Sequence, residues 1–182
     1  MKRITSFLFC YFFILAIYSQ DIGYRTVDIG GEYQWHKGGN IIGLHLALNA
    51  KIYHGIQVRV GYLNADHEQS GNHQEEKGSG WGGGLGYRYY FKPIPHKFFL
   101  GLRTDIWRKK IDWIDINSVA TGTSKTWEII PSLETGYLFL INDQGFITPT
   151  LSAGYEVNIK TEGAETKRGF LLLAGISAGF RF

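Results

Sequence analysis

Apolar and polar residues alternate with a period of two over most of the chain, which is the pattern of β-strands with two chemically different faces. The clearest case is the C-terminal segment. Its apolar face consists of Phe170, Leu172, Ala174, Ile176, Ala178, Phe180 and Phe182. The same pattern predicts eight strands and no helix after residue 20. The predicted strands span residues 26–35, 41–51, 55–66, 80–91, 98–112, 125–140, 146–159 and 169–182.

The predicted strands are long, and the connections between them alternate in length. Most strands reach the ~9–11 residues that a tilted strand needs to cross a bilayer. Short connections fall near 51–54, 92–97 and 142–145, and longer polar connections fall near 66–79, 115–124 and 160–168, with a short loop at 36–40 on the same side as the longer ones. Short turns at one end and long loops at the other are typical of bacterial outer-membrane barrels. We predict an all-β fold: an eight-stranded antiparallel up-and-down transmembrane β-barrel with a plugged polar interior.

The charged residues indicate which face of the predicted barrel meets lipid. A soluble lipocalin-like barrel also alternates, but it places apolar side chains inside and polar ones outside. Here the faces with small residues carry six acidic and five basic groups among many glycines, and large apolar residues dominate the opposite faces. Glycine weakens a solvent-exposed strand, whereas inside a narrow barrel it leaves room for long side chains. We therefore predict that the charges face inward and form ion pairs, with an ion or proton path as the alternative interpretation. They are Asp28, Glu32, Lys51, Arg59, Arg88, Arg103, Asp105, Glu128, Glu134, Glu156 and Arg181.

Aromatic residues collect at two levels of the predicted barrel. At the long-loop ends they are Trp35, Trp81, Trp107, Trp113 and Trp127. At the short-turn ends they are Tyr89, Phe91, Phe98, Tyr137, Phe139, Phe146, Phe180 and Phe182. Aromatic side chains favour the two membrane–water interfaces, so we predict that these residues form two belts around a lipid-facing band.

With these features, the chain from residue 21 to residue 182 resembles the small eight-stranded outer-membrane proteins of Gram-negative bacteria, the OmpA-barrel and OmpX kind. The most specific element is the C-terminal segment that ends at Phe182. It is similar to the signal that such proteins present to the outer-membrane assembly machinery. The resemblance implies that Phe170, Leu172, Ile176, Phe180 and Phe182 carry this signal. A shared fold at this level implies no activity.

Composition and the first twenty residues bear on location. Charged residues make up 19% of the chain, below the ~25% of soluble domains. Lys2 and Arg3 precede an apolar run at 4–18, the layout of a cleaved secretory signal peptide over residues 1–20. Its removal would take away two of 19 basic groups and Cys10, and leave 17 basic against 16 acidic groups. This balance contains no basic cluster for nucleic acid. We expect a barrel domain over 21–182, exported to the cell outer membrane.

One polar segment carries candidate chemistry. His67, Glu68, Ser70 and His73 lie within the predicted loop at 66–79. A histidine beside a serine and an acid could serve an outer-leaflet enzyme of the lipid A acyl-hydrolase or acyltransferase type. No spacing in the segment matches a metal motif, and a solvated loop explains it equally well. We expect no cofactor and no metal, and we keep the enzyme as the alternative function.

The preferred function is a structural or interaction role without an open pore. The expected partners are outer-membrane lipid and lipopolysaccharide, the assembly machinery during biogenesis, and an envelope protein that contacts the outer loops or the barrel wall. The pairs Lys109-Lys110 and Lys167-Arg168 fall near the predicted outer rim, where lipid phosphates lie. Solvated charge pairs are the alternative interpretation.

Overall fold

A computed structural model describes residues 26–50, 53–70, 73–92, 97–115, 121–163 and 169–182. The predicted signal peptide and the inward charge predicted at Lys51 lie outside these residues. Eight strands account for nearly all of the described chain. They are β1 (Thr26–His36), β2 (Gly39–Ala50), β3 (His54–Ser70), β4 (His73–Tyr90), β5 (Lys97–Asp115), β6 (Thr121–Ile141), β7 (Gly145–Glu162) and β8 (Gly169–Arg181).

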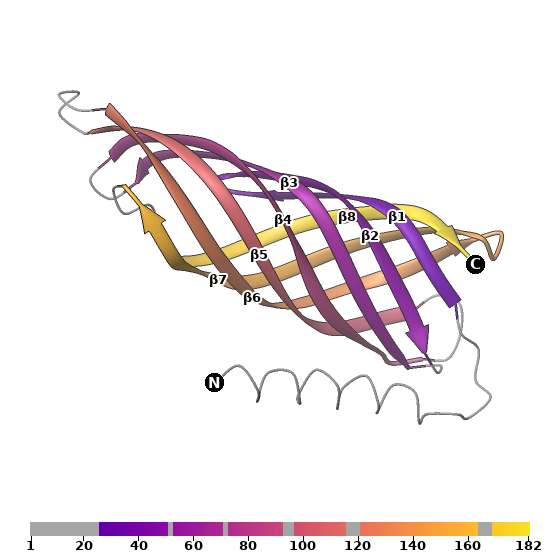
Figure 1. Cartoon of the computed structure of the whole chain (residues 1–182). Helices are drawn as coiled ribbons and strands as arrows, with labels where there is room; N and C mark the ends of the chain where they lie inside the picture. Colours follow the sequence, from indigo (N-terminus) through magenta and orange to yellow (C-terminus); the bar gives the residue numbers. More distant parts are fainter. Residues whose placement is uncertain (1–25, 51–52, 71–72, 93–96, 116–120, 164–168) are drawn as a thin grey trace, which may run out of the picture.

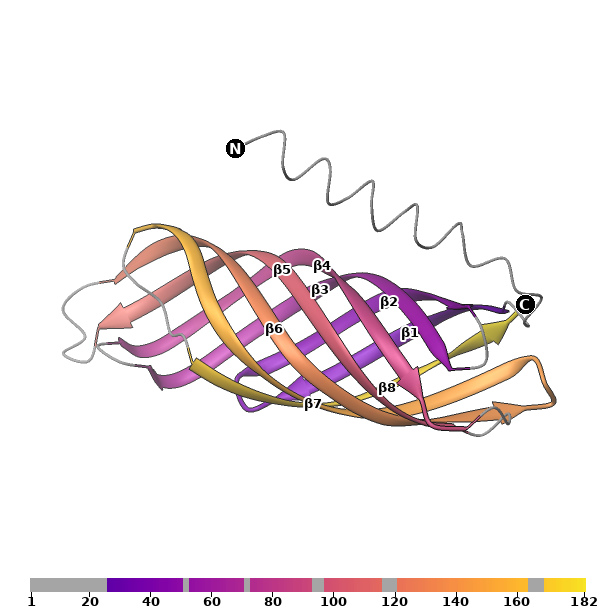
Figure 2. The same ribbon diagram turned by 90° about the horizontal axis from the view of Figure 1, so that it is seen from below.

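The strands form one closed barrel in chain order (Figure 1). Every neighbouring pair is antiparallel, and β8 closes the barrel by pairing with β1 from Asp28↔Arg181 to His36↔Leu173. The strands are steeply tilted relative to the barrel axis, as the view from below also shows (Figure 2). The predicted fold class and the eight predicted strands are confirmed. Within the described residues, no helix is long and apolar enough to cross a membrane.

Exposure alternates along the strands over most of the residues whose side chains the structure describes, as a period-two sequence requires. The outward positions are overwhelmingly apolar. On β2, for example, Ile42, Leu44 and Leu48 are 56%, 65% and 49% exposed. A soluble monomer rarely exposes a contiguous apolar patch of more than a few hundred Å². An apolar band that encircles the barrel is therefore a lipid-facing wall.

The strands extend beyond their predicted ends on the long-loop side, and the predicted loop at 66–79 is wrong. Most of this segment belongs to β3 and β4, whose pairing continues to Ser70↔His73. The sequence of this segment is polar at nearly every position, so it carries no apolar/polar alternation. Backbone pairing continues without it, so polarity alone did not reveal the strands.

Strands β3 to β6 project farther than their neighbours at this end. The last pair between β2 and β3 is Gly39↔Ala65, and the last pair between β6 and β7 is Lys125↔Glu162. Beyond these pairs the four strands continue as an open sheet, seen at the left end of the barrel in Figure 1. At the opposite end, β6 joins β7 through a tight turn with positive φ at Asn142 and Asp143. The projecting sheet marks the long-loop side as the outer side of the membrane.

Candidate functional site

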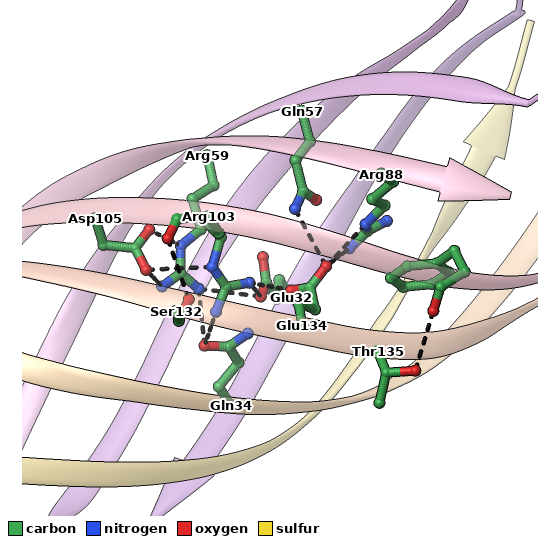
Figure 3. A network of polar contacts seen from close by, with 11 residues as sticks. Glu32, Gln34, Gln57, Arg59, Arg88, Arg103, Asp105, Ser132, Glu134 and Thr135 are labelled. Carbon is green, nitrogen blue, oxygen red and sulfur yellow. Dashed lines mark hydrogen bonds and ion pairs between the residues drawn. The ribbon is translucent and has the colours of Figure 1, made fainter.

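A network of buried charges crosses the barrel interior (Figure 3). Arg59 on β3 forms a bidentate pair with Asp105 on β5, with both nitrogen–oxygen distances 2.7 Å. Arg103, also on β5, donates to Asp105 and to Glu134 on β6. Arg88 on β4 donates to the other oxygen of Glu134 at 2.8 Å. Charge-assisted pairs of this kind are the strongest hydrogen bonds that side chains form.

The network reaches the opposite wall of the barrel through β1. Arg59 donates to Glu32 at 3.0 Å and to the side-chain carbonyl of Gln34 at 2.9 Å. Gln57 adds a donor to Glu134. We call these eight residues the central charge network: Glu32, Gln34, Gln57, Arg59, Arg88, Arg103, Asp105 and Glu134. Three arginines face three carboxylates, so the network is neutral and its charges satisfy one another, as burial requires.

Glycines on β4 provide the space that the network occupies. A Cβ atom on Gly84 would overlap the carboxylate of Asp105, and one on Gly86 would lie 2.6 Å from the side-chain nitrogen of Gln57. A Cβ on Gly82 would overlap the ring of Trp107. The three glycines occupy alternate, inward-facing positions. The glycine-rich face of β4 is therefore a recess for side chains from β3 and β5.

Apolar layers lie above and below the network, so the interior is less polar than predicted. The outer layer consists of Ile41, Leu63, Ala65, Trp107, Ile130, Leu171 and Leu173. The inner layer consists of Tyr90, Phe99, Leu138 and Phe146. One arginine of the network packs against each layer. Arg59 lies 5.5 Å from the Trp107 ring of the outer layer, and Arg88 lies 4.3 Å from the Phe99 ring of the inner layer.

Three belt predictions are therefore wrong. Trp107 is 0% exposed and faces the interior, and Phe146 is 2% exposed in the inner layer. Trp113 shares the inward alternation of Trp107 on β5 and donates to Ser124. Trp35, Trp81 and Trp127 face outward, with 58%, 71% and 43% exposure. Height along the barrel was not sufficient, because facing depends on whether the position along the strand is odd or even.

A second buried cluster lies between the outer apolar layer and the outer rim. Lys109 on β5 pairs with Glu128 on β6, and its ammonium lies 3.8 Å from Glu156 on β7. The prediction that Lys109 joins Lys110 at the rim is wrong, since Lys109 is 3% exposed. Lys109 has the same inward alternation as Arg103 and Asp105, and this was the signal that could have identified it. Lys110 is exposed as predicted, and Lys167 and Arg168 lie outside the described residues.

A further ion pair, outside these two clusters, joins the last strand to the first. Arg181 on β8 donates to both oxygens of Asp28 on β1, at 2.6 and 2.7 Å. Asn49 on β2 donates to the same carboxylate. Phe182 continues this closure through its backbone, which exchanges two hydrogen bonds of 2.9 Å with Val27. The ring of Phe182 is 74% exposed on the outer wall.

The structure places the candidate enzyme residues on a strand hairpin. Ser70 at the end of β3 is the register partner of His73 at the start of β4, and His67 is paired with Glu76. Glu68 is the register partner of Glu75 on the same hairpin. The segment therefore lies at the far end of the projecting sheet. Among the residues whose side chains the structure describes, no three His, Cys, Asp or Glu side chains converge as a metal site would require.

Four exposed cations gather on the outward faces of β5, β6 and β7 at the top of the lipid band. We call Arg108, Lys110, Lys125 and Lys160 the outer-rim basic patch. Register pairing makes Lys110 the direct neighbour of Lys125, and Trp127 the neighbour of both Arg108 and Lys160. Arg108 lies 5.7 Å from the centre of the Trp127 ring. The patch therefore borders the outward-facing tryptophans.

A closed antiparallel barrel with a lipid-facing apolar wall and a neutralised, charged interior is a β-barrel protein of the Gram-negative outer membrane. Within that class, the family model of the autotransporter β-domain matches residues 16–173, and the chain belongs to this family. No curated protein sequence matches the chain.

Solved structures of outer-membrane barrels are similar over most of their length. A major outer membrane protein from Thermus thermophilus is 13% identical with a TM-score of 0.60, over 87% of this chain and 100% of that one. The N-terminal β-barrel domain of Pseudomonas aeruginosa OprF is 14% identical with a TM-score of 0.49, over 88% and 99%. At this identity the Thermus structure supports the fold alone. The resemblance to small outer-membrane barrels is confirmed.

Proposed function

We propose that the protein is a closed, non-conducting outer-membrane barrel with a structural or interaction role. The central charge network carries this proposal, because it joins β1 to β3, β4, β5 and β6 across the lumen. An eight-stranded barrel is just wide enough for side chains to fill. The apolar layers on both sides add a barrier to ions, since a charge that enters them loses its hydration.

Conductance in a planar lipid bilayer tests the closed interior. We expect wild-type protein, inserted in the folded state, to give no stepwise current, while an open porin in the same bilayer gives regular steps. The variant Gly84→Ala, refolded to the same extent in the same lipid, is the comparison. Current from this variant and none from wild type would attribute the closed state to the network and not to the lipid composition. Regular single-channel steps from wild-type barrels would contradict the proposal.

The interaction role rests on the outer end of the barrel. The projecting sheet of β3 to β6 and the outer-rim basic patch present polar and cationic surface to the outside and to the outer leaflet. Lipopolysaccharide and other envelope proteins are the partners that such a surface fits. Extraction from the native membrane in mild detergent, followed by mass measurement, tests for a stable protein partner. A lone barrel that carries lipid alone would restrict the role to lipid contact.

An outer-leaflet lipid-modifying enzyme is the second candidate. The observation that favours it is the register pair Ser70↔His73, which brings a hydroxyl residue and a histidine to one hairpin end. Release of fatty acid from lipid A by the pure protein, and its loss in His67→Ala and His73→Ala, would support this activity. Equal rates in wild type and both variants would remove it.

A further inference from the structure

The outer-rim basic patch contains a like-charged pair. Lys110 on β5 and Lys125 on β6 are direct register partners on the outward face. Side chains in such positions are about 5 Å apart at Cβ, and like charges there destabilise the sheet. Arg108 follows two residues along the same face of β5. Three cations thus occupy adjacent positions of one wall, an arrangement that an anion bound between them would stabilise.

The acidic residues of the same face are fewer than its cations. Glu162 is the register partner of Lys125, but its carboxylate pairs with Lys160 at 2.8 Å. Asp112 accepts a hydrogen bond from Thr123 on the next strand. Asp66 lies opposite Lys77, one register row farther out. Three carboxylates on this face thus lie among five cations, so a net positive charge remains. The acids are Asp66, Asp112 and Glu162, and the cations are Lys77, Arg108, Lys110, Lys125 and Lys160.

A groove lies between the three cations and the neighbouring strand. It is lined by Tyr62, Ser79, Trp81, Arg108, Lys110 and Lys125. Ser79 is small and is the register partner of Lys110 on β4, so it forms a floor with a hydroxyl that can donate a hydrogen bond. Larger aromatic and cationic side chains surround it. Such a groove fits an anionic group with several acceptor oxygens, of which a phosphate is the simplest.

The height of the groove indicates that the anion belongs to a lipid. Trp81 and Trp127, which flank Arg108 by register, are residues of the outward aromatic level. The next register row toward the membrane centre is apolar: Val60, Gly83, Ile106, Ile129 and Val157. The patch therefore lies where the phosphates of outer-leaflet glycolipids lie, at the boundary between the polar and apolar zones.

A separate apolar hollow lies two register rows farther toward the membrane centre, on β5 to β8, and shares the strands β5 and β6 with the groove. Small side chains, Thr104, Pro131 and Ala153, lie between the larger Leu102, Leu133, Tyr155 and Phe170 in this hollow. Thr104 is four residues from Arg108 along β5, or about 13 Å at ~3.3 Å per residue. The hollow can hold an acyl chain whose head group occupies the groove, since depressions in an apolar wall gain dispersion contacts when filled.

We propose that one wall of the barrel, over β4 to β7, is a specific binding site for a phosphorylated, acylated glycolipid of the outer leaflet. A phosphate binds Arg108, Lys110, Lys125 and Ser79, and an acyl chain lies in the hollow at Thr104, Pro131 and Ala153. The site specifies the interaction role proposed above and rests on it. A lipid fits both halves of the site, whereas an acidic protein would use the cations alone.

The test measures lipid retention by the full barrel in phosphatidylcholine nanodiscs that contain bisphosphorylated lipid A. Native mass spectrometry counts the lipid A molecules that stay bound. The test variant is Lys110→Gln with Lys125→Gln. The matched control is Lys37→Gln with Lys92→Gln, which removes two exposed charges outside the patch. We expect the test variant to bind lipid A roughly tenfold more weakly than wild type, because it loses charge-assisted contacts to phosphate. The control keeps these contacts and should bind lipid A as wild type does.

Two further arms distinguish the source of the anion. Dephosphorylated lipid A should bind wild type as weakly as lipid A binds the test variant, and inorganic phosphate should not displace lipid A at matched concentration. Equal retention by wild type and test variant, or displacement by inorganic phosphate, would overturn the proposal. Ion conductance by the wild type would instead overturn the closed-barrel function, and lipid retention does not depend on that result.

Discussion

Arg59 and Asp105 form a bidentate ion pair that crosses over an intervening strand. Arg59 lies on β3, Asp105 on β5, and the residue of β4 that is the register partner of both is Gly84. The pair can close because Gly84 has no side chain at the point where the carboxylate lies. One glycine thus lets two strands that are not neighbours form two hydrogen bonds of 2.7 Å.

Adding one methyl group at this point should disturb the pair. We expect Gly84→Ala to destabilise the barrel by about 1–3 kcal/mol, the usual cost of overpacking an interior. Urea unfolding in lipid vesicles, followed by tryptophan fluorescence, measures the change. Gly31→Ala is the matched control, because a Cβ there meets nothing within 4 Å and faces outward. Equal stability of the two variants would show that the recess at Gly84 is not required.

Breaking the ion pair from one side should cost more than removing it entirely. Asp105→Asn leaves Arg59 buried with an incomplete charge balance, and we expect a loss of about 3–5 kcal/mol. Replacing both residues by apolar ones, Arg59→Met with Asp105→Leu, removes the unpaired charge. The double variant should therefore be more stable than the sum of its single variants predicts. Additive losses in the same unfolding experiment would argue against direct coupling.

The alternation of the sequence was sufficient for the strands and for the facing of most charges. Lipid on one side and a narrow interior on the other give each strand two contrasting faces, and Arg59, Arg88 and Glu134 were identified from that contrast. Which of these charges pair with one another was not predicted, because Arg59 reaches past β4 to Asp105. The apolar/polar pattern of one strand does not indicate how far its side chains reach across neighbouring strands.

The errors occurred where the contrast between faces is lost. Most of the predicted loop at 66–79 is strand, and its run of polar residues has no period-two apolar pattern that would have revealed it. The outer apolar layer was missed because Leu171 and Leu173 lie inside while Phe170 and Leu172 lie outside, so both faces there are apolar. Trp107 and Lys109 were assigned by height alone, although both follow the inward alternation of Asp105.

Lys109 and its sequence neighbour Lys110 offer a direct comparison of facing. We expect Lys109→Gln to destabilise the barrel by about 3–5 kcal/mol, since Glu128 and Glu156 lose the cation that compensates their burial. Lys110→Gln, on the exposed face, should change stability by less than about 0.5 kcal/mol. Urea unfolding of both variants in the same lipid measures the two changes in the free energy of unfolding. Similar losses for the two would place both lysines in equivalent environments.

The facing of the tryptophans can be measured by quenching with brominated lipid. Variants that keep one tryptophan each, with the others replaced by phenylalanine, report the two environments. Trp81 is 71% exposed on the outer wall and should be strongly quenched. Trp107 lies in the outer apolar layer inside the barrel and should keep nearly all of its fluorescence. Equal quenching of the two would contradict the inward position of Trp107.

The C-terminal residue should matter for assembly more than for stability. The backbone of Phe182 completes the β1–β8 closure through Val27, while its ring is exposed to lipid. Phe182→Ala therefore keeps the backbone hydrogen bonds, and we expect unfolding in vesicles to shift by less than about 1 kcal/mol. The yield of the variant in the outer membrane should fall, because the resemblance implies that the assembly machinery recognises this ring. The matched control is Phe91→Ala, because Phe91 directly follows β4 and its ring is also exposed, at 52%. Normal insertion of Phe182→Ala, or an equal loss in Phe91→Ala, would show that the exposed ring serves only as lipid contact.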